Sequence, residues 1–190
     1  MDGVVGGNVL VARMQRAAQL DVALYNEVEH DPAATPQAFH VVLIAGVASG
    51  LGTFLSLLLR GHGVAGLAGL VSEVVSLVVN WFVWSYVTYF IGTRLFNGRA
   101  TPQELLRTLG FAITPLVLNV LGFIPVLGGL ARFVAFWWMV IAGVIAVREA
   151  LDVGTGAAIL TVIIGAVCML VIWGVMVVVL AALSLPLRLL

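Results

Sequence analysis

The chain has 190 residues, of which 62% are hydrophobic and only 9% are charged, and its mean hydropathy is +1.17. Because a soluble domain carries about 25% charged residues, this composition excludes a soluble fold and predicts that apolar side chains face lipid. The formal net charge is zero, so nothing indicates a nucleic-acid partner, and the length is that of one domain. The single cysteine, Cys168, cannot form an intrachain disulfide.

The N-terminal part, residues 1–39, carries seven charges and is predicted to be a cytosolic or interfacial segment ahead of a transmembrane domain, residues 40–190. Within residues 8–28, apolar side chains recur at i, i+3, i+4 and i+7 spacing, which predicts an amphipathic helix. This helix either lies on the membrane surface or packs on the transmembrane bundle, and the sequence leaves both interpretations open. Pro36 suits the first turn of the next helix, with Thr35 as its predicted N-cap.

Five apolar segments follow, and a helix needs roughly 20 apolar residues to cross the hydrocarbon core. They are residues 41–59, 64–93, 108–131, 130–147 and 157–183. The third is expected to stop early because Gly122 and Pro125 interrupt it, and Pro115 and Pro125 are predicted to kink the helix. The sequence therefore predicts an all-α, polytopic membrane bundle of five transmembrane helices plus an N-terminal amphipathic helix.

Arginine residues in the short loops predict the orientation of these spans. Six lie on the face of the N-terminus, namely Arg13, Arg16, Arg94, Arg99, Arg107 and Arg148. Three lie on the opposite face, namely Arg60, Arg132 and Arg188. This excess predicts a cytoplasmic N-terminus and a C-terminus outside. A second topology stays open, in which the third and fourth spans form one re-entrant hairpin and the C-terminus lies inside.

A helix start is predicted at Thr101-Pro102-Gln103-Glu104, because this segment is a capping box with proline at the first helical position. The following residues enter the membrane as helix, so Arg99 and Arg107 are expected at headgroup depth, where each attracts anionic lipid by about 1 kcal/mol. The predicted lipid-binding or partner-binding residues of the cytosolic face are Arg99, Arg107, Arg148 and Asp152.

Glu73 is an ionisable residue within the second predicted span, and such a residue is by default a hypothesis for a functional site. Ser76 and Asn80 follow at i+3 and i+7 on the same helix face, and Asn119 and Arg132 are predicted partners from neighbouring spans. The functional interpretation is a proton or cation relay, or a polar substrate site. The structural interpretation is a Glu73–Arg132 pair, or a protonated Glu73 that is hydrogen-bonded to Ser76.

No catalytic set is recognisable in the sequence. The three histidines are not clustered, and the chain has no HExxH, GxSxG or Walker-type motif. We therefore predict no enzymatic activity, no cofactor and no metal site.

The segment from Gly98 to Asp152 carries the most specific motifs of the chain. They include Gly110-Phe111-Ala112-Ile113-Thr114-Pro115, Ile124-Pro125 and Ala146-Val147-Arg148-Glu149-Ala150-Leu151-Asp152. In these motifs the chain resembles the Yip domain family (Ypt-interacting proteins) in its prokaryotic form, and Gly110 to Pro115 resembles the family's Gly-Tyr…Pro motif with Phe111 in place of the tyrosine. Asp31-Pro32 lies where eukaryotic relatives carry a longer motif, and the resemblance extends over most of the chain from about this point.

The resemblance implies five transmembrane helices with a cytosolic N-terminus, in agreement with the arginine count. All nine basic residues are arginine, a usage typical of GC-rich prokaryotes, so we expect a prokaryotic plasma membrane. Eukaryotic members bind prenylated Rab-type GTPases through longer N-terminal regions, and this role is not carried over to the present chain.

The expected function is that of a small membrane scaffold. It would act on the lipid bilayer, on anionic lipids, on other membrane proteins or on further copies of itself. The alternative is a small transporter or channel that uses the polar site around Glu73.

Overall fold

The computed structural model describes residues 2–184, and every regular element in this range is a helix. The elements are α1 (Asp2–Ala18), α2 (Val22–His30), α3 (Ala34–Leu58), α4 (Gly63–Leu95), α5 (Pro102–Ala112), the 3-10 helix η1 (Thr114–Phe123), α6 (Leu127–Ala150) and α7 (Thr155–Ser184). The predicted all-α membrane bundle is therefore confirmed in class.

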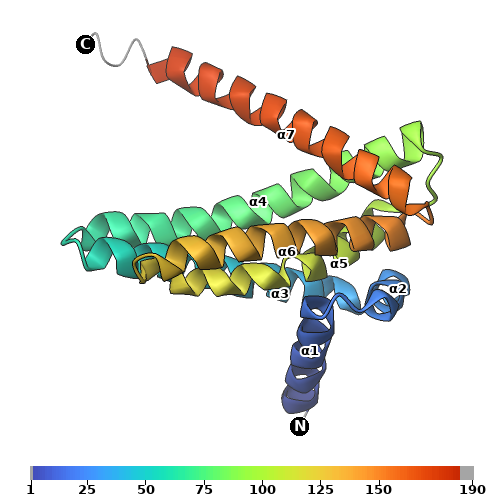
Figure 1. Cartoon of the computed structure of the whole chain (residues 1–190), viewed down its shortest axis with the longest axis horizontal. Helices are drawn as coiled ribbons and strands as arrows, with labels where there is room; N and C mark the ends of the chain where they lie inside the picture. The colour runs from blue at the N-terminus through green and yellow to red at the C-terminus, as the bar shows by residue number, and fades with distance from the viewer. Residues whose placement is uncertain (1, 185–190) are drawn as a thin grey trace.

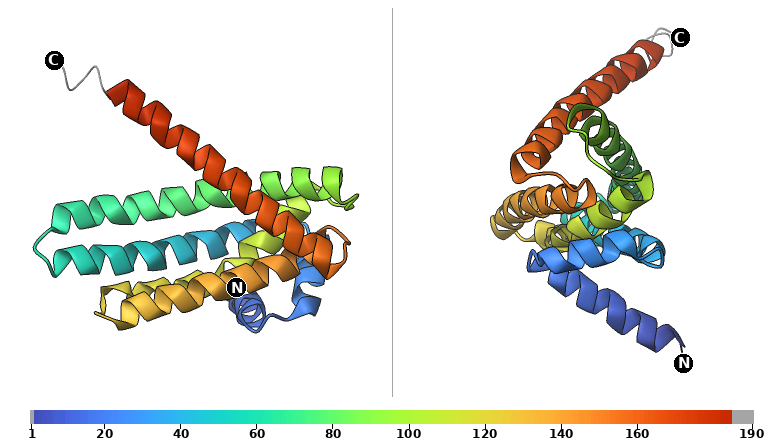
Figure 2. Two further views of the ribbon diagram at one scale, coloured as in Figure 1. Left: turned by 45° about the horizontal axis from the view of Figure 1, so that its top comes forward. Right: turned by 90° about the vertical axis from the view of Figure 1, so that its right-hand side faces the viewer.

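The helices α3, α4 and α6 run alongside one another (Figure 1), α5 contacts all three, and η1 lies against α3 and α6. We call the end with α2, α5 and the α6–α7 loop the head end, and the end with the α3–α4 and η1–α6 turns the turn end. Helix α1 projects from the bundle on one side, while α7 starts at the head end and diverges on the other (Figure 2). The two outermost helices thus leave the bundle in opposite directions.

Four helices, α3, α4, α6 and α7, are long and apolar enough to cross a membrane. The pair α5–η1 is a fifth candidate span if its two parts, bent by 40°, are counted together. Because α5–η1 leads away from the head end and α6 leads back to it, the side reached after α6 is the same whether the pair crosses the membrane or forms a hairpin. The expectation that a re-entrant hairpin would move the C-terminus inside was therefore wrong.

The break within the third span lies beside Pro115. Helix α5 ends at Ala112, and Pro115 stands at the start of η1, where its missing N–H cannot continue an α-helical ladder. The Thr114 hydroxyl donates to the Phe111 carbonyl at 2.7 Å and satisfies a group that the break leaves free. Pro125, in contrast, lies in the turn after η1 and not within a helix, because Val126 has a φ of 64° and reverses the chain there.

Glycines permit close contact between α3 and its neighbours. Cβ atoms added at Gly46 and Gly50 would lie 3.1 Å and 3.0 Å from the Cα atoms of Val74 and Leu70 on α4. At Gly52 the added Cβ would lie 2.2 Å from the Asn119 carbonyl oxygen of η1. The α3 backbone therefore packs directly on η1, as is usual where small residues line transmembrane contacts.

The N-terminal segment differs from the single predicted helix over residues 8–28. It forms two helices, because Leu20 has a left-handed φ of 59° and the Asp21 carboxylate accepts from the Ala23 amide at 3.0 Å to start α2. The prediction that Thr35 caps α3 was also wrong. The N-cap of α3 is Ala33, whose own amide binds the Asp31 carboxylate at 2.9 Å, so Asp31 shapes the turn.

The best-buried part of the protein is at the head end. Helix α5 is buried from Leu105 onward, and α2 packs against it and against α6 through fully buried Leu24, Tyr25 and Val28. Most of the outer surface of α7 is apolar and exposed, which suits a helix that faces lipid. Of the two interpretations of the N-terminal segment, α2 follows the one in which it packs on the bundle.

Candidate functional site

The capping box at the start of α5 is confirmed. The Glu104 amide donates to the Thr101 hydroxyl at 3.3 Å, and the Thr101 amide donates to the Glu104 carboxylate at 2.8 Å. Two amides that a helix start leaves free are thereby satisfied. This start fixes the direction in which α5 leads from the head end into the bundle.

The two charged loops of the head end lie side by side. The Arg99 amide donates to the Leu151 carbonyl at 2.9 Å, and the Leu151 side chain fills the space that Gly92 and Gly98 leave free. Arg99 and Asp152 are exposed, and Arg148 is half-buried and pairs with Glu149 at 2.8 Å. Of the four residues predicted for the cytosolic face, Arg99 and Asp152 thus lie in adjoining loops, and Arg148 lies in the last turn of α6 beside them.

Arg107, the fourth of these residues, is placed differently from the expectation that it reaches lipid headgroups. Only 8% of it is exposed, because α2 covers it, and its guanidinium donates to the Glu29 main-chain carbonyl. Its Nε has no hydrogen-bond partner. Arg107 therefore connects α5 to the end of α2 inside the protein and is not available to a lipid.

Glu29 is the most unusual acidic residue of the head end. It is 4% exposed, and its Oε2 has no hydrogen-bond partner. Burial raises the pKa of Glu29 to about 7 from an ordinary 4.5, while nearby His30 acts to lower this pKa. Asp152, Glu104 and Glu149 are close enough to raise the same pKa further. A buried carboxyl of this kind holds a proton near neutral pH.

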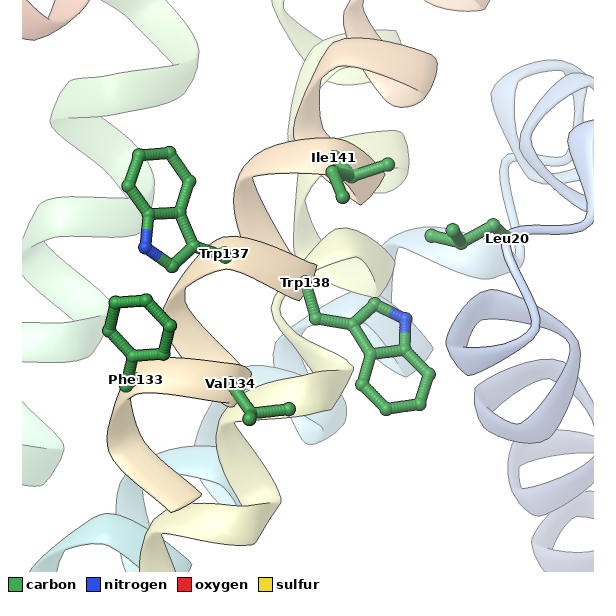
Figure 3. Close-up of a pocket in the computed structure, with 6 residues that line it drawn as sticks. All are labelled: Leu20, Phe133, Val134, Trp137, Trp138 and Ile141. Carbon is green, nitrogen blue, oxygen red and sulfur yellow. The ribbon is translucent and has the colours of Figure 1, made fainter. Parts of the chain in front are cut away.

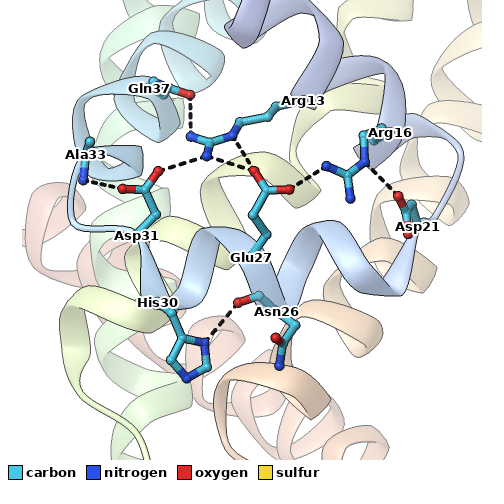
Figure 4. Close-up of polar contacts among 9 residues, drawn as sticks. All are labelled: Arg13, Arg16, Asp21, Asn26, Glu27, His30, Asp31, Ala33 and Gln37. Carbon is cyan, nitrogen blue, oxygen red and sulfur yellow. Dashed lines mark hydrogen bonds and ion pairs between the residues drawn. The ribbon is translucent and has the colours of Figure 1, made fainter.

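A network of charges, absent from our predicted sites, fixes α1 to its neighbours (Figure 4). The Arg13 guanidinium donates to Glu27, to Gln37 at 2.9 Å and to Asp31 at 2.8 Å, and so connects α1 with α2, the α2–α3 turn and α3. Arg16 reaches Glu27 as well and lowers the pKa of that carboxyl. The i, i+3 spacing of the two arginines, followed by a run of acids, was the available signal in the sequence.

An apolar hollow of about 580 Å³ lies between α6 and the α1–α2 turn. Leu20 faces Trp138 and Ile141 across it, and Phe133, Val134 and Trp137 complete its lining (Figure 3). The indole N–H of Trp138 is buried without a partner. The lining contains no carboxylate, imidazole or thiol, so it suits an apolar group and no acid–base chemistry.

Glu73 lies on the exposed surface of α4, ten residues after the helix begins at Gly63. At about 1.5 Å per residue, this is roughly 15 Å along the helix and near the middle of a hydrocarbon core of about 30 Å. Glu73 takes part in none of the ion pairs among the described residues. The predicted pair with Arg132 does not form, because the Arg132 guanidinium lies beside Gly122.

The other predicted polar residues form contacts that do not include Glu73. Asn80 accepts from the Trp173 indole of α7 at 3.2 Å. Asn119 donates to the Ser49 hydroxyl at 3.1 Å, and its own side-chain oxygen is buried without a partner. Ser76 is half-buried, one turn beyond Glu73.

Three polar residues of α3 were not among the predicted sites. Ser49, Thr53 and Ser56 recur at i, i+4 and i+7, and all three are half-buried. The Thr53 methyl group lies 3.1 Å from where a Cβ at Gly69 would stand, and Gly69 is one turn before Glu73. Thr53 therefore lies against α4 one turn before Glu73, whereas Ser49 bonds to Leu116 and Asn119 of η1. We call the following set the intramembrane seam: Ser49, Thr53, Ser56, Glu73, Ser76, Asn80, Asn119 and Arg132.

Within residues 2–184, no group of three or more His, Cys, Asp or Glu side chains is arranged to hold a metal ion. What the geometry offers is a polar head with a buried carboxyl, and a row of hydroxyls, amides and two opposite charges along the outside of apolar helices. Both features suit binding of lipid or of protein.

Comparison with known proteins identifies the family. Searches of curated proteins and of solved structures return no significant match. The family model for the Yip1 domain, in contrast, matches residues 23–182, from the second residue of α2 through nearly all of α7. The chain belongs to the Yip1 domain family of integral membrane proteins.

Proposed function

We propose that the protein is a membrane scaffold whose head end lies in the cytoplasm and binds anionic lipids or other membrane proteins. The observation that carries this proposal is the concentration of charged groups and buried contacts at one end of the bundle. The head end holds the Arg13 network, the Glu29–Arg107 contact and the joined loops around Leu151. The turn end, among described residues, carries Arg60 and Arg132 as its arginines.

Helix α1 is the second support for a scaffold at the membrane surface. It projects sideways from the bundle (Figure 1), and Arg13 connects it to Gln37, four residues into the α3 helix. Val9 and Val11 of α1 are exposed. A helix in this position lies along the membrane interface, with its apolar residues toward the acyl chains.

The proposal predicts that the exposed Arg99 and the half-buried Arg148 at the head end retain anionic lipid. We expect Arg99→Gln and Arg148→Gln each to reduce the phosphatidylglycerol that stays bound, since one juxtamembrane arginine contributes about 1 kcal/mol, or roughly fivefold in affinity. The measurement is native mass spectrometry of the full chain released from mixed phosphatidylglycerol–phosphatidylcholine vesicles. Arg60→Gln, which makes the same change at the turn end, is the matched control. Equal loss in all three variants would contradict a specific cytosolic face.

A second candidate function is a small transporter that uses the polar site around Glu73. It is favoured by one observation, namely that the carboxyl of Glu73 is exposed at mid-membrane depth without a partner among the described residues. An ionisable group in this environment costs a few kcal/mol unless it meets water, an ion or a polar ligand.

A further inference from the structure

The intramembrane seam combines polar residues of α3 and α4 with Asn119 of η1 and Arg132 of α6, whereas much of the exposed surface of α3 and α4 is apolar. The seam residues of α3 and α4 carry hydroxyl, amide and carboxyl groups at helical spacing along each helix. Exposed residues elsewhere on the two helices include Val47 and Leu51 of α3 and Val71 and Val75 of α4. Ordinary lipid-facing helix is apolar throughout, so a polar row at the helix surface indicates contact with something other than acyl chains.

The seam extends along most of the membrane normal. Counting from the turn end, Ser56 lies two residues before Leu58 and Ser49 lies nine before it, or about 3 and 14 Å along α3. On α4, Glu73 and Asn80 lie ten and seventeen residues after Gly63, or about 15 and 26 Å along the helix. Polar groups are therefore spaced over most of a hydrocarbon core of about 30 Å.

Helix α7 covers only the part of this row that is nearest the head end. Trp173 of α7 donates to Asn80, and α7 then diverges from the bundle toward its C-terminal end (Figures 1 and 2). Ser76 is half-buried and Glu73 is exposed, so the part of the row between Asn80 and the turn end opens sideways to the bilayer. A ligand that reaches it from the side comes from the lipid phase.

The charges of the seam match one class of lipid. Glu73 supplies an acceptor for a cation, and Arg132 supplies a guanidinium that binds phosphate well. Neither is engaged in an ion pair within the described chain. The half-buried hydroxyls of Thr53 and Ser56 can replace water around a headgroup, whereas the Ser49 hydroxyl already accepts from Asn119 and donates to the Leu116 carbonyl.

We propose that the intramembrane seam takes the zwitterionic headgroup of a phospholipid, with its ammonium group at Glu73 and its phosphate at Arg132, and lets such headgroups pass between the leaflets. This inference rests on the second candidate function, because it names the substrate of that same site. The acyl chains of the passing lipid stay in the bilayer beside α4 while the headgroup follows the polar row.

The test is transbilayer lipid exchange by the full chain in phosphatidylcholine vesicles. A phosphatidylcholine probe with a fluorophore on its acyl chain is followed as dithionite bleaches the outer leaflet. We expect exchange above that of empty vesicles, and we expect Glu73→Gln and Arg132→Gln each to slow it about tenfold or more, since a lost charged contact of about 1.4 kcal/mol is tenfold. Arg94→Gln, a charge removal at the exposed head end of α4, should leave the rate unchanged.

A phosphatidylglycerol probe, which has no ammonium group, sharpens the assignment. Its exchange should fall with Arg132→Gln and should not fall with Glu73→Gln. Helix content by circular dichroism confirms that both glutamine variants fold, as expected for removal of exposed intramembrane charges. Equal effects of Glu73→Gln on both probes would overturn the assigned orientation of the headgroup.

Further arms separate failure of this inference from failure of the candidate transporter. If no lipid exchange occurs but a pH-sensitive dye inside the vesicles reports a Glu73-dependent proton flux, the lipid substrate is wrong and the transporter stands. If neither flux is seen, both are wrong. If the protein is a dimer that dissociates with Glu73→Gln or Arg132→Gln, and no lipid exchange occurs, then a second copy covers the seam and the inference is overturned.

Discussion

At the scale of single residues, Glu29 shows how burial moves the pKa of a carboxyl toward neutral pH. The residue lies in the last turn of α2 beside Arg107, yet the guanidinium binds the Glu29 main-chain carbonyl and leaves the carboxyl oxygen Oε2 without a partner. An ionised carboxyl in this place would be poorly solvated and would face Asp152, Glu104 and Glu149. The neutral form is therefore the one that fits the packed α2.

This residue predicts that the docking of α2 depends on pH. Because the pKa of Glu29 is about 7 in the folded protein and 4.5 ordinarily, the folded form holds the proton more tightly. Docking should be most stable below pH 4.5 and weaken as pH rises to about 7. The change should be on the order of 2 kcal/mol, given about 1.4 kcal/mol per pKa unit and some relaxation.

Hydrogen exchange of the α2 amides in lipid nanodiscs, corrected for intrinsic rates, measures this dependence. In Glu29→Gln the side chain stays neutral, so the protection of α2 should no longer fall between pH 5 and pH 8. An unchanged pH dependence in the variant would show that another group, such as His30, is responsible.

At the scale of elements, the contact between α3 and η1 depends on a residue with no side chain. The carbonyl of Asn119 occupies the position that a Cβ of residue 52 would take, at 2.2 Å. Backbone cannot yield as the end of a flexible side chain can, so the two helices would have to separate. We expect Gly52→Ala to destabilise the bundle by about 1–3 kcal/mol, as overpacking of a well-filled core does.

Gly129→Ala is the matched control for this prediction. It adds the same methyl group near the start of α6, where nothing lies within 4 Å of the new atom. Thermal unfolding in detergent, followed by tryptophan fluorescence, should show a lower midpoint for Gly52→Ala and no loss for Gly129→Ala. Equal midpoints would mean that η1 moves aside at little cost.

What the sequence could predict about these elements follows from the range of the interactions involved. The spans and the Thr101 capping box depend on hydrophobicity and on neighbours a few residues away, so the sequence alone predicts them. The turn at Leu20, the start of α3 and the burial of Arg107 depend on contacts between distant segments. Arg107 lies 78 residues from Glu29, whose carbonyl it binds, and no periodicity signals such a pair.

The polar site around Glu73 shows the same difference between local patterns, which the sequence predicts, and tertiary contacts, which it does not. Glu73, Ser76 and Asn80 were recognisable because their helical spacing places them on one face of α4. Their predicted partners were less accessible to sequence reasoning. Asn119 binds Ser49, and Arg132 lies beside Gly122, so tertiary packing decided contacts that residue type alone left open.

At the scale of the whole molecule, the two ends of the bundle differ in construction. The head end buries α2 and α5 beneath charged loops, whereas the turn end consists of short connections. Helix α4, with 33 residues, is about 50 Å long and exceeds a hydrocarbon core of about 30 Å. A helix of this length either tilts or extends into the aqueous phase, and the buried core around its head end favours extension.

This asymmetry predicts which face of the membrane each end occupies. In a Cys168→Ser background, a cysteine replacing Gln103 at the start of α5 should react with a membrane-impermeant maleimide only after the cells are permeabilised. A cysteine replacing His62 in the α3–α4 turn should react in intact cells. Both positions are exposed in the structure, so a cysteine that fails to react with the maleimide lies on the other side of the membrane and is not buried in the protein. The opposite labelling pattern would place the arginine-rich head end outside, against the bias that short basic loops impose on membrane insertion, and with it the proposed cytosolic binding face would be lost.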